Sequence, residues 1–349
     1  MRILYGVQGT GNGHITRARV MATELARRGV QVDFLFSGRA PQGYFDMAVF
    51  GDFQTRPGLT FVARQGRISL VSTLLQSRPA RLIRDIQTLP VKDYDLVVND
   101  FEPVTAWAAR RAGVPSVGVS HQAAFLKAIP KEGESLGASL LMRHFAPTDI
   151  QLGVHWHHFG QSLLPPIIEH RRQHGPVRSD KIIVYLPFES PTAIAALLAP
   201  FPHVEFYCYH PEVSPEDRGH LHFRAPSRQG FHRDLADAAG VISNGGFELS
   251  SEALCLGKKL LLKPLQGQFE QGSNVLTLRQ LGLATSMHRL STSTLDAWLT
   301  LPPAKPVSYP PVAPRLVDWL LAGDWHSREA LCRSLWQEVS FPDYCRLPG

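Results

Sequence analysis

The sequence predicts an α/β protein built from two doubly wound, Rossmann-like domains, and three observations lead to that prediction. Apolar strand-like runs alternate with helical runs over the first 119 residues, and a second alternating series begins at residue 181. The chain has 349 residues, which is enough for two domains of ordinary size. Strand–helix–strand alternation is typical of a parallel sheet with helices on both faces.

The first series is expected to form an N-terminal domain over residues 1–160. Apolar residues at helical spacing between Ile15 and Ala26 predict its first helix, and Gly29 is a suitable C-terminal stop. A second helix is predicted over 103–113. The predicted strands of this series cover residues 2–7, 30–36, 95–100 and 114–119.

The second series is expected to form a C-terminal domain over residues 181–315, after a linker at 161–180 that contains a Pro pair and several basic residues. Its predicted strands cover 181–187, 204–209, 240–244 and 259–264. Its predicted helices cover 191–199, 231–239, 247–257 and 269–282. The Pro-rich run 302–314 excludes regular helix, and amphipathic residues 318–338 predict terminal helices within 316–349. Two such halves leave a cleft, and ligands bind at the carboxyl ends of parallel strands.

Composition narrows the classes of protein to which the chain can belong. Hydrophobic residues make up 44% and charged residues 19%, which is a globular and not a disordered composition. No apolar run reaches the ~20 residues of a membrane-spanning helix, and the N-terminus resembles a strand more than a signal peptide. The four cysteines form no C-x-x-C pair, which argues against a zinc site or a disulfide framework. We therefore expect a cytoplasmic protein.

The net charge of +6 comes from 36 basic and 30 acidic residues. This modest excess favours a phosphate-bearing ligand, and it leaves open a peripheral contact with an anionic membrane surface at the inner membrane face. It is equally typical of a slightly basic soluble protein. No block of Lys and Arg and no interleaved aromatic platform is present, so nucleic acid is not expected as a partner.

A glycine-rich turn follows the first predicted strand, in VQGTGNGHITRA at 7–18. Gly9, Gly11 and Gly13 permit positive φ and a close approach of the backbone to a ligand, and a helix N-terminus favours negative charge. A dinucleotide fingerprint would have Gly where His14 stands, and Asp33 lies too early in the second strand for the expected acid. The NAD-binding interpretation is therefore weak. His14 would face the cleft, and histidine is the commonest general base.

A second polar interruption lies in ISNGGFELSSEALCLGKKLLLKPLQGQFEQGSN at 242–274. Paired glycines after a strand allow backbone N–H groups to reach phosphate oxygens. A carboxylate one or two helical turns further along can accept both hydroxyls of a ribose. Acid and amide side chains near 270–274 offer acceptors and donors that suit a polyol. A surface loop would explain each residue singly but not their joint spacing, so the block predicts a ligand pocket.

Together these motifs resemble the nucleotide-sugar glycosyltransferases of the two-Rossmann GT-B type. The resemblance is to the peptidoglycan N-acetylglucosaminyltransferase and UDP-glycosyltransferase families, and to a less characterised bacterial and archaeal branch of the same group. It covers about residues 1–290 and is most specific at 240–282. It implies an inverting hexosyltransferase that moves a sugar from a nucleoside-diphosphate sugar, with UDP as the expected nucleotide, to a hydroxyl acceptor on a cell-envelope glycan, lipid or small molecule. It also implies that the C-terminal helices return to the N-terminal domain.

The resemblance assigns residues to roles. His14 matches the catalytic base and Asp100 the acid that orients it. Glu252 matches the acid that holds the donor ribose. The other residues that it places at the donor are Asn244, Gly245, Gly246, Phe247, Gln268, Glu270, Gln271 and Asn274. On the acceptor side it places Gly11, Gly13, His121 and Gln122.

Two departures from the family pattern leave the identity of the sugar open. Glu248 and Leu249 stand where the plant-type signature has Asn-Ser, and the acid expected to contact the sugar is Glu270 instead of Asp. No cofactor and no metal are expected, and His155, His157 and His158 are expected to pack and not to bind metal. Two other functions remain open: a hydrolysing sugar-nucleotide epimerase, which shares this architecture, and a non-catalytic sugar-nucleotide sensor.

Overall fold

The computed structural model describes residues 1–59, 63–64, 67–68, 79–169 and 175–348, and these residues form two compact units. Unit 1 comprises the described residues of 1–129, 134–169 and 309–339. Unit 2 comprises 130–133, 175–308 and 340–348. Of the expected linker at 161–180, residues 161–169 belong to unit 1, and 170–174 lie outside the described residues.

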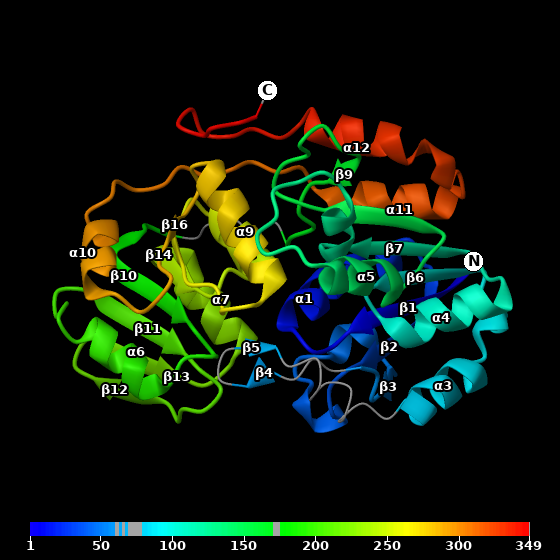
Figure 1. Cartoon of the computed structure of the whole chain (residues 1–349), viewed down its shortest axis with the longest axis horizontal. Coiled ribbons are helices and arrows are strands. Elements are labelled where there is room, and N and C mark those ends of the chain that lie inside the picture. Colours follow the sequence, from blue (N-terminus) through cyan, green and yellow to red (C-terminus); the bar gives the residue numbers. More distant parts are fainter. Residues whose placement is uncertain (60–62, 65–66, 69–78, 170–174, 349) are drawn as a thin grey trace. The chain divides into compact units, whose positions relative to one another are not determined.

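Unit 1 is organised around a seven-stranded sheet in the order β3-β2-β1-β6-β7-β8-β9, in which every neighbouring pair is parallel (Figure 1). Its strands are β1 Arg2–Gln8, β2 Gln31–Ser37, β3 Gln54–Arg56, β6 Leu96–Asp100, β7 Ser116–Ser120, β8 Ile150–Val154 and β9 Leu163–Leu164. A separate antiparallel pair consists of β4 Ala63–Arg64 and β5 Arg67–Ile68. In the register of β1 and β6, Val7 lies beside Asp100, so the loop after β1 leaves the sheet next to the end of β6.

The helices of unit 1 follow the strand–helix alternation that the sequence predicts. They are α1 Asn12–Arg27, α3 Pro79–Thr88, α4 Pro103–Ala112, α5 Leu136–His144, α11 Val312–Ala322 and α12 Arg328–Trp336. Short 3₁₀ turns occur at η1 Pro41–Gly43, η2 Ala48–Phe50, η3 Val91–Asp93, η4 Gln122–Leu126 and η5 Trp325–Ser327. Helices α3 and α5 and strand β8 lie where the sequence predicted no element.

The C-terminal helices α11 and α12 belong to unit 1, where α11 packs against α1. Arg28, just after α1, donates to the carboxylate of Asp318 at 2.5 Å and to the carbonyl of Pro314 at 2.9 Å. Helix α11 begins at Val312, inside the Pro-rich run from which the sequence excluded helix. That prediction was wrong because Pro314 falls in the first turn, where the backbone N–H has no intrahelical partner to lose.

Unit 2 is built on a second seven-stranded sheet, in the order β12-β13-β11-β10-β14-β15-β16. All of its neighbouring strands are parallel except the edge pair β12 and β13. The strands are β10 Arg178–Tyr185, β11 Glu205–Tyr209, β12 Glu216–Arg218, β13 Leu221–Arg224, β14 Ala238–Ser243, β15 Lys259–Leu262 and β16 Thr285–Ser286. The helices are α6 Pro191–Leu198, α7 Arg228–Asp237, α8 Phe247–Cys255, α9 Phe269–Gln280 and α10 Thr292–Leu299.

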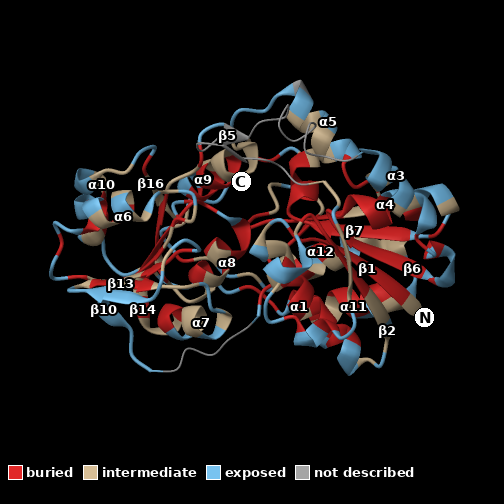
Figure 2. Ribbon diagram, turned by 90° about the horizontal axis from the view of Figure 1, so that it is seen from below, coloured by how far each residue is buried: buried red, intermediate tan, exposed pale blue. Residues whose placement is uncertain are grey.

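The core of each unit lies along its central strands, which Figure 2 shows as buried while the helices outside them are partly exposed. In β1, every residue after Arg2 is buried, as expected for a parallel strand that is covered on both faces. The predicted α/β class with two doubly wound sheets is confirmed. Among the described residues, no helix is both long and apolar enough to cross a bilayer.

Candidate functional site

The candidate base in unit 1 lies at the start of α1. Gly11 is the N-cap of this helix in an extended conformation, so His14 is the third residue of the helix. No side chain caps the helix N-terminus, and its first turn contains no acid. The His14 side chain is 13% exposed, which leaves one edge of the ring accessible.

The three loop glycines do not act in the way that the sequence suggested. None of Gly9, Gly11 and Gly13 has positive φ. Gly9 is required by close packing, because a Cβ there would stand 2.2 Å from the Tyr44 hydroxyl oxygen. A Cβ on Gly11 would meet only the His14 ring, 4.0 Å away. The positive φ that these glycines permit is therefore not adopted, and the loop leads into α1 without it.

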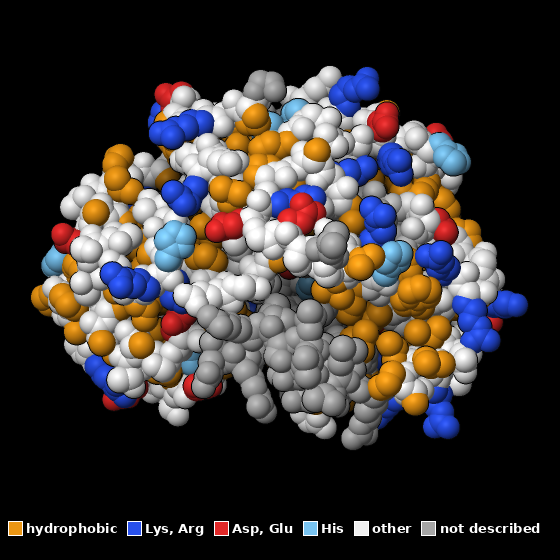
Figure 3. All heavy atoms as spheres, viewed as in Figure 1, with side chains coloured by type: hydrophobic (Ala, Val, Ile, Leu, Met, Phe, Trp, Pro, Cys, Tyr) orange, Lys and Arg blue, Asp and Glu red, His pale blue; other side chains and the backbone are white. Residues whose placement is uncertain are grey.

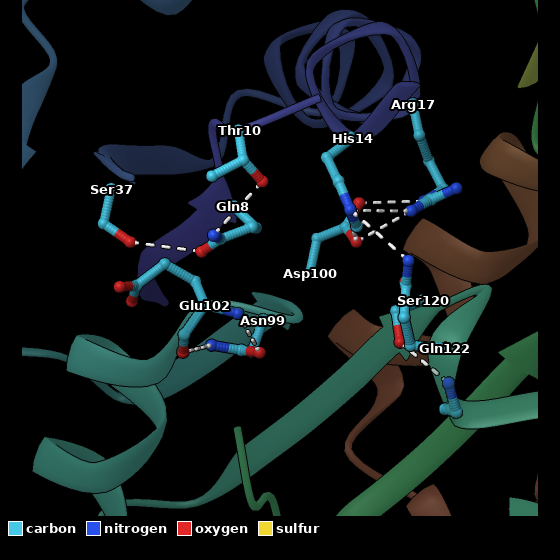
Figure 4. Close-up of polar contacts among 11 residues, drawn as sticks. Gln8, Thr10, His14, Arg17, Ser37, Asn99, Asp100, Glu102, Ser120 and Gln122 are labelled. Carbon is cyan, nitrogen blue, oxygen red and sulfur yellow. Dashed lines mark hydrogen bonds and ion pairs between the residues drawn. The ribbon is translucent and has the colours of Figure 1, made fainter. Parts of the chain in front are cut away.

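Asp100 is the last residue of β6, and its carboxylate faces His14 (Figure 4). The distance from His14 Nδ1 to Asp100 Oδ1 is 2.7 Å. Because the ionised carboxylate only accepts, Nδ1–H donates to it and Nε2 keeps its lone pair. The amide nitrogen of Gln122 lies 3.5 Å from that Nε2. This arrangement can accept a proton at Nε2 while Asp100 stabilises the imidazolium.

Arg17 is a member of this cluster that the sequence analysis missed. Its Nε and Nη2 donate to the two carboxylate oxygens of Asp100 at 2.8 Å and 2.7 Å, and both side chains are buried. Burial alone would raise the pKa of Asp100, but the charges of Arg17 and His14 and their hydrogen bonds hold that pKa below its ordinary value. Asp100 is thus kept ionised. The i, i+3 spacing of His14 and Arg17 on one helix face was the available signal.

The two candidate acceptor residues after β7 have different surroundings. Gln122, at the start of η4, lies near His14. His121 is buried, and its Nδ1–H donates to the carbonyl oxygen of Val154 at 2.9 Å. Its ring packs against Phe125 and Trp156. The structure therefore brings Gln122, but not the imidazole of His121, to the candidate base.

In unit 2, the loop between β14 and α8 carries the paired glycines. Gly245 has φ of +79°, and a Cβ there would meet a methyl group of Val275 at 2.9 Å. Gly246 is the N-cap of α8, with φ of −67° and no atom within 4 Å of a Cβ position. Asn244 is buried and donates to the carbonyl of Lys263 at 2.9 Å. Gly245 therefore permits the conformation of the loop, and Gly246 leaves the N-terminus of α8 open.

Phe247 and Asn274 support this loop from the interior. Phe247, the first residue of α8, is buried. Asn274 of α9 is fully buried, and its amide donates to the carbonyl oxygen of Gly245 at 3.0 Å. The structure therefore places Asn274 behind the backbone of the glycine loop, where it holds the loop in position.

The start of α9 carries three more of the candidate donor residues. Gln268 is the N-cap, and its side-chain oxygen accepts from the backbone N–H of Gln271. The side-chain oxygen of Gln271 accepts from the backbone N–H of Leu265 at 2.9 Å, which fixes the orientation of its amide. Glu270 lies in the first turn and is partly exposed. The structure thus brings these side chains together at the loop between β15 and α9.

Glu252 of α8 has a partner that the sequence analysis missed. His232 Nε2, on α7, lies 3.4 Å from Glu252 Oε2, and both side chains are little exposed. His232 Nδ1 is buried without a hydrogen-bond partner among the described residues. No sequence signal links the two, because they lie on different helices. The pair orients the Glu252 carboxylate.

The histidines after β8 pack, as predicted. His155 is fully buried, and its Nδ1 accepts from the backbone N–H of Trp156 at 2.9 Å. Burial holds the pKa of His155 well below its ordinary value. Nδ1 of His157 accepts from the backbone N–H of Phe159. Over the described ranges, no three His, Cys, Asp or Glu residues come together as a metal site.

Comparisons with known proteins bear on the whole chain. A family model for glycosyl transferase family 1 matches residues 1–303. The solved structure of LpCGTa in complex with UDP has a TM-score of 0.60 at 15% identity, over 97% of this chain and 98% of that chain. The glycosyltransferase SnogD from Streptomyces nogalater has a TM-score of 0.57 at 15% identity, over 92% and 99%. A glycosyltransferase of Streptomyces sp. SF2575, complexed with thymidine diphosphate, has a TM-score of 0.55 at 14% identity, over 97% and 95%.

At these identities the likeness shows the fold, which is the GT-B arrangement that the sequence predicted. Among proteins with curated descriptions, none matches the sequence.

Proposed function

Because this chain belongs to glycosyl transferase family 1, we propose that it moves a sugar from a nucleoside-diphosphate sugar to a hydroxyl acceptor with inversion. The observation that carries the proposal is the 2.7 Å contact between His14 Nδ1 and Asp100 Oδ1. An acceptor hydroxyl is a poor nucleophile at neutral pH, and an oriented imidazole is the group that best activates it.

In the proposed reaction, the acceptor oxygen attacks the anomeric carbon of the donor sugar and its proton passes to His14 Nε2. The bond between that carbon and the diphosphate oxygen breaks, and both electrons leave with the diphosphate. Asp100 accepts the hydrogen bond from Nδ1–H throughout and stabilises the imidazolium that forms. Arg17 holds both carboxylate oxygens of Asp100 and so fixes the direction of that hydrogen bond.

Unit 2 is proposed to bind the donor. The open N-terminus of α8 after Gly246 offers backbone N–H groups and a favourable helix dipole for the leaving diphosphate, so we propose that no metal is required. Glu252 would accept from the ribose hydroxyls, and Glu270 and Gln271 would contact the sugar. UDP is the proposed nucleotide, and its support is that one structure of this fold is a complex with UDP and another a complex with thymidine diphosphate.

The acceptor is proposed to be a cell-envelope glycan, a lipid or a small molecule, and the reaction is proposed to take place in the cytoplasm. The first experiment is a thermal-shift screen of UDP-, dTDP-, GDP- and CMP-sugars, because a ligand at a hundred times its Kd stabilises by roughly 2.7 kcal/mol. The best donor is then incubated with and without candidate acceptors. Turnover that depends on acceptor supports transfer. Turnover of donor alone would support an epimerase, and binding that is indifferent to His14→Ala without turnover would support a sensor.

A further inference from the structure

Unit 1 contains a hollow of about 370 Å³ that the proposed transfer does not use. It is lined by the end of α4, by η4, by the end of α5, by the residues before β8 and by the first residue of α12. Its charged lining consists of Arg110, Lys127, Arg143, Arg328 and Asp149, and His144 adds an imidazole. The volume is in the range of small-molecule sites.

The hollow reaches the amino ends of the strands, away from the edge that carries Asp100. Asp149, in its lining, accepts from the backbone N–H and the hydroxyl of Ser116 at 2.9 Å and 2.8 Å. Ser116 is the first residue of β7, whereas Asp100 is the last residue of the neighbouring parallel strand. A five-residue strand is on the order of 13 Å long. The hollow thus reaches the opposite end of the sheet from Asp100, while Ala123 and Leu126 of η4 line another side of it.

The cations in this lining are not neutralised by the protein. Over the described part of the chain, none of Arg110, Lys127, Arg143 and Arg328 forms an ion pair. The one carboxylate in the lining, on Asp149, is already engaged with Ser116. Four permanent positive charges therefore face one negative charge around a single hollow. Such an arrangement destabilises the free protein by repulsion and favours an anion.

The surface next to the hollow also carries basic side chains. Figure 3 shows Lys, Arg and His side chains over the part of the molecule where Figure 1 places α4 and α5. Helix α4 ends with two successive cations, Arg110 and Arg111, and helix α5 ends with Arg143 and His144. Cationic side chains in the last turn of a helix interact favourably with the helix dipole, so the ends of α4 and α5 are suitable positions for these groups.

We propose that this hollow binds a ligand that carries two or more phosphate groups. Guanidinium groups bind phosphate through paired hydrogen bonds, and three of the four cations here are arginines. The phosphates can belong to a soluble phosphorylated metabolite or to the headgroup of an anionic lipid. The inference does not rest on the proposed transfer, because neither His14 nor Asp100 lines this hollow.

Isothermal titration with inorganic pyrophosphate tests the proposal, with Arg110→Glu and Arg111→Glu as a matched pair. Both residues are exposed and lie in the last turn of α4, but only Arg110 lines the hollow. We expect Arg110→Glu to weaken binding by on the order of tenfold or more, and Arg111→Glu to weaken it far less. Arg143→Glu, on another helix, should repeat the effect. Affinity should also fall as salt concentration rises.

Pyrophosphate can also bind at the loop between β14 and α8 in all these variants, so the titration is repeated in the Gly246→Ala background, where a methyl group should obstruct the approach of phosphate to that loop. Sedimentation with phosphatidylcholine vesicles that contain cardiolipin, whose headgroup carries two phosphates, identifies the source of the phosphate. Pyrophosphate binding that depends on Arg110 supports a soluble ligand, and vesicle binding alone with that dependence supports a lipid headgroup. Equal losses in Arg110→Glu and Arg111→Glu, or no binding of either probe, would overturn the proposal. Thermal unfolding of each variant verifies that it is folded.

Discussion

Nδ1 of His14 lies 2.7 Å from Oδ1 of Asp100, although 86 residues separate the two in the chain. The parallel register of β1 and β6 creates this contact, because it places Val7 beside Asp100 and so starts α1 over the end of β6. Arg17, one helical turn after His14, binds the same carboxylate. The orientation of the candidate base is therefore set by the sheet and by its own helix together.

His14→Ala should lower transfer by on the order of 10²–10⁴-fold, since a positioned general base contributes about that much. Donor affinity should stay nearly unchanged, because the donor is expected to bind unit 2. The measurement is turnover of the best donor of the thermal-shift screen, together with calorimetry of that donor. Asp100→Asn should give a smaller loss, and the double variant should be far from additive because the two act as a unit. Wild-type turnover in His14→Ala would end the base hypothesis.

Arg17→Met should destabilise unit 1 in a way that depends on pH. Removing one partner of a buried ion pair costs about 3–5 kcal/mol, because the other charge is left uncompensated. The folded-state pKa of Asp100 in the wild type is lowered from 3.8, so its contribution to stability is complete above that value and is lost as pH falls through the folded pKa. In the variant, Asp100 is buried without the charge of Arg17, so its protonated, neutral form is favoured.

The difference in unfolding free energy between wild type and Arg17→Met should therefore be largest at neutral pH and should narrow as pH falls toward 3.8. Denaturant unfolding over this pH range measures it. Arg19→Met is the matched control, because Arg19 is also buried in α1 but donates to the backbone carbonyls of Phe45 and Asp46. A difference in unfolding free energy that is the same at every pH would refute the proposed role of the ion pair.

The sequence predicted helices and strands correctly where the spacing of apolar residues and the positions of glycine indicate the same element. The strand before the first glycine loop is predicted at 2–7 and ends at Gln8. The helix after it ends at Arg27, two residues before Gly29, which has φ of +66°. Strand β14 and helices α8 and α9 also lie where the sequence pattern predicted them. Apolar runs and glycine positions are local signals, so one sequence is enough to read them.

What the sequence did not predict depends on contacts across the fold. Arg17 appears as an ordinary polar residue of an amphipathic helix until the register of β6 places Asp100 against it. His232 meets Glu252 from another helix. Asn274 was expected at the donor, yet it turns inward to the backbone of Gly245. The direction of a helical side chain depends on tertiary packing, and the spacing of residues in the sequence does not reveal that packing.

Gly245 and Gly246, in the loop between β14 and α8, should respond differently to substitution by alanine. Gly245→Ala should destabilise the protein by roughly 1–3 kcal/mol, because φ of +79° is strained for any residue with a Cβ and Val275 is in the way. Gly246→Ala should leave thermal stability nearly unchanged, since its φ is ordinary and its Cβ would point into open space. It should still weaken UDP binding by about tenfold, because a methyl group would obstruct the approach of phosphate to the backbone. Unchanged UDP affinity in Gly246→Ala would place the diphosphate elsewhere.

Glu270→Ala and Gln271→Ala should reduce discrimination among UDP-sugars and spare the affinity for UDP itself. Both residues lie in the first turn of α9, and the Gln271 amide is oriented by the backbone of Leu265. Calorimetry with UDP and with several UDP-sugars separates the two effects. Equal losses for UDP and for all UDP-sugars would mean that these residues hold the nucleotide or the fold instead.

Glu252→Ala should weaken UDP binding by roughly 1.5–3 kcal/mol, because the ribose hydroxyls lose a charged acceptor. His232→Ala should have a smaller effect in the same direction, since its Nε2 contacts the carboxylate and not the ligand. The nucleotide itself supplies the control. The deoxyribose of thymidine diphosphate has one hydroxyl fewer than the ribose of UDP, so Glu252→Ala should cost less affinity for thymidine diphosphate, and none for pyrophosphate. The same loss for all three ligands would show that Glu252 acts on the loop or on the fold, and not on the ribose.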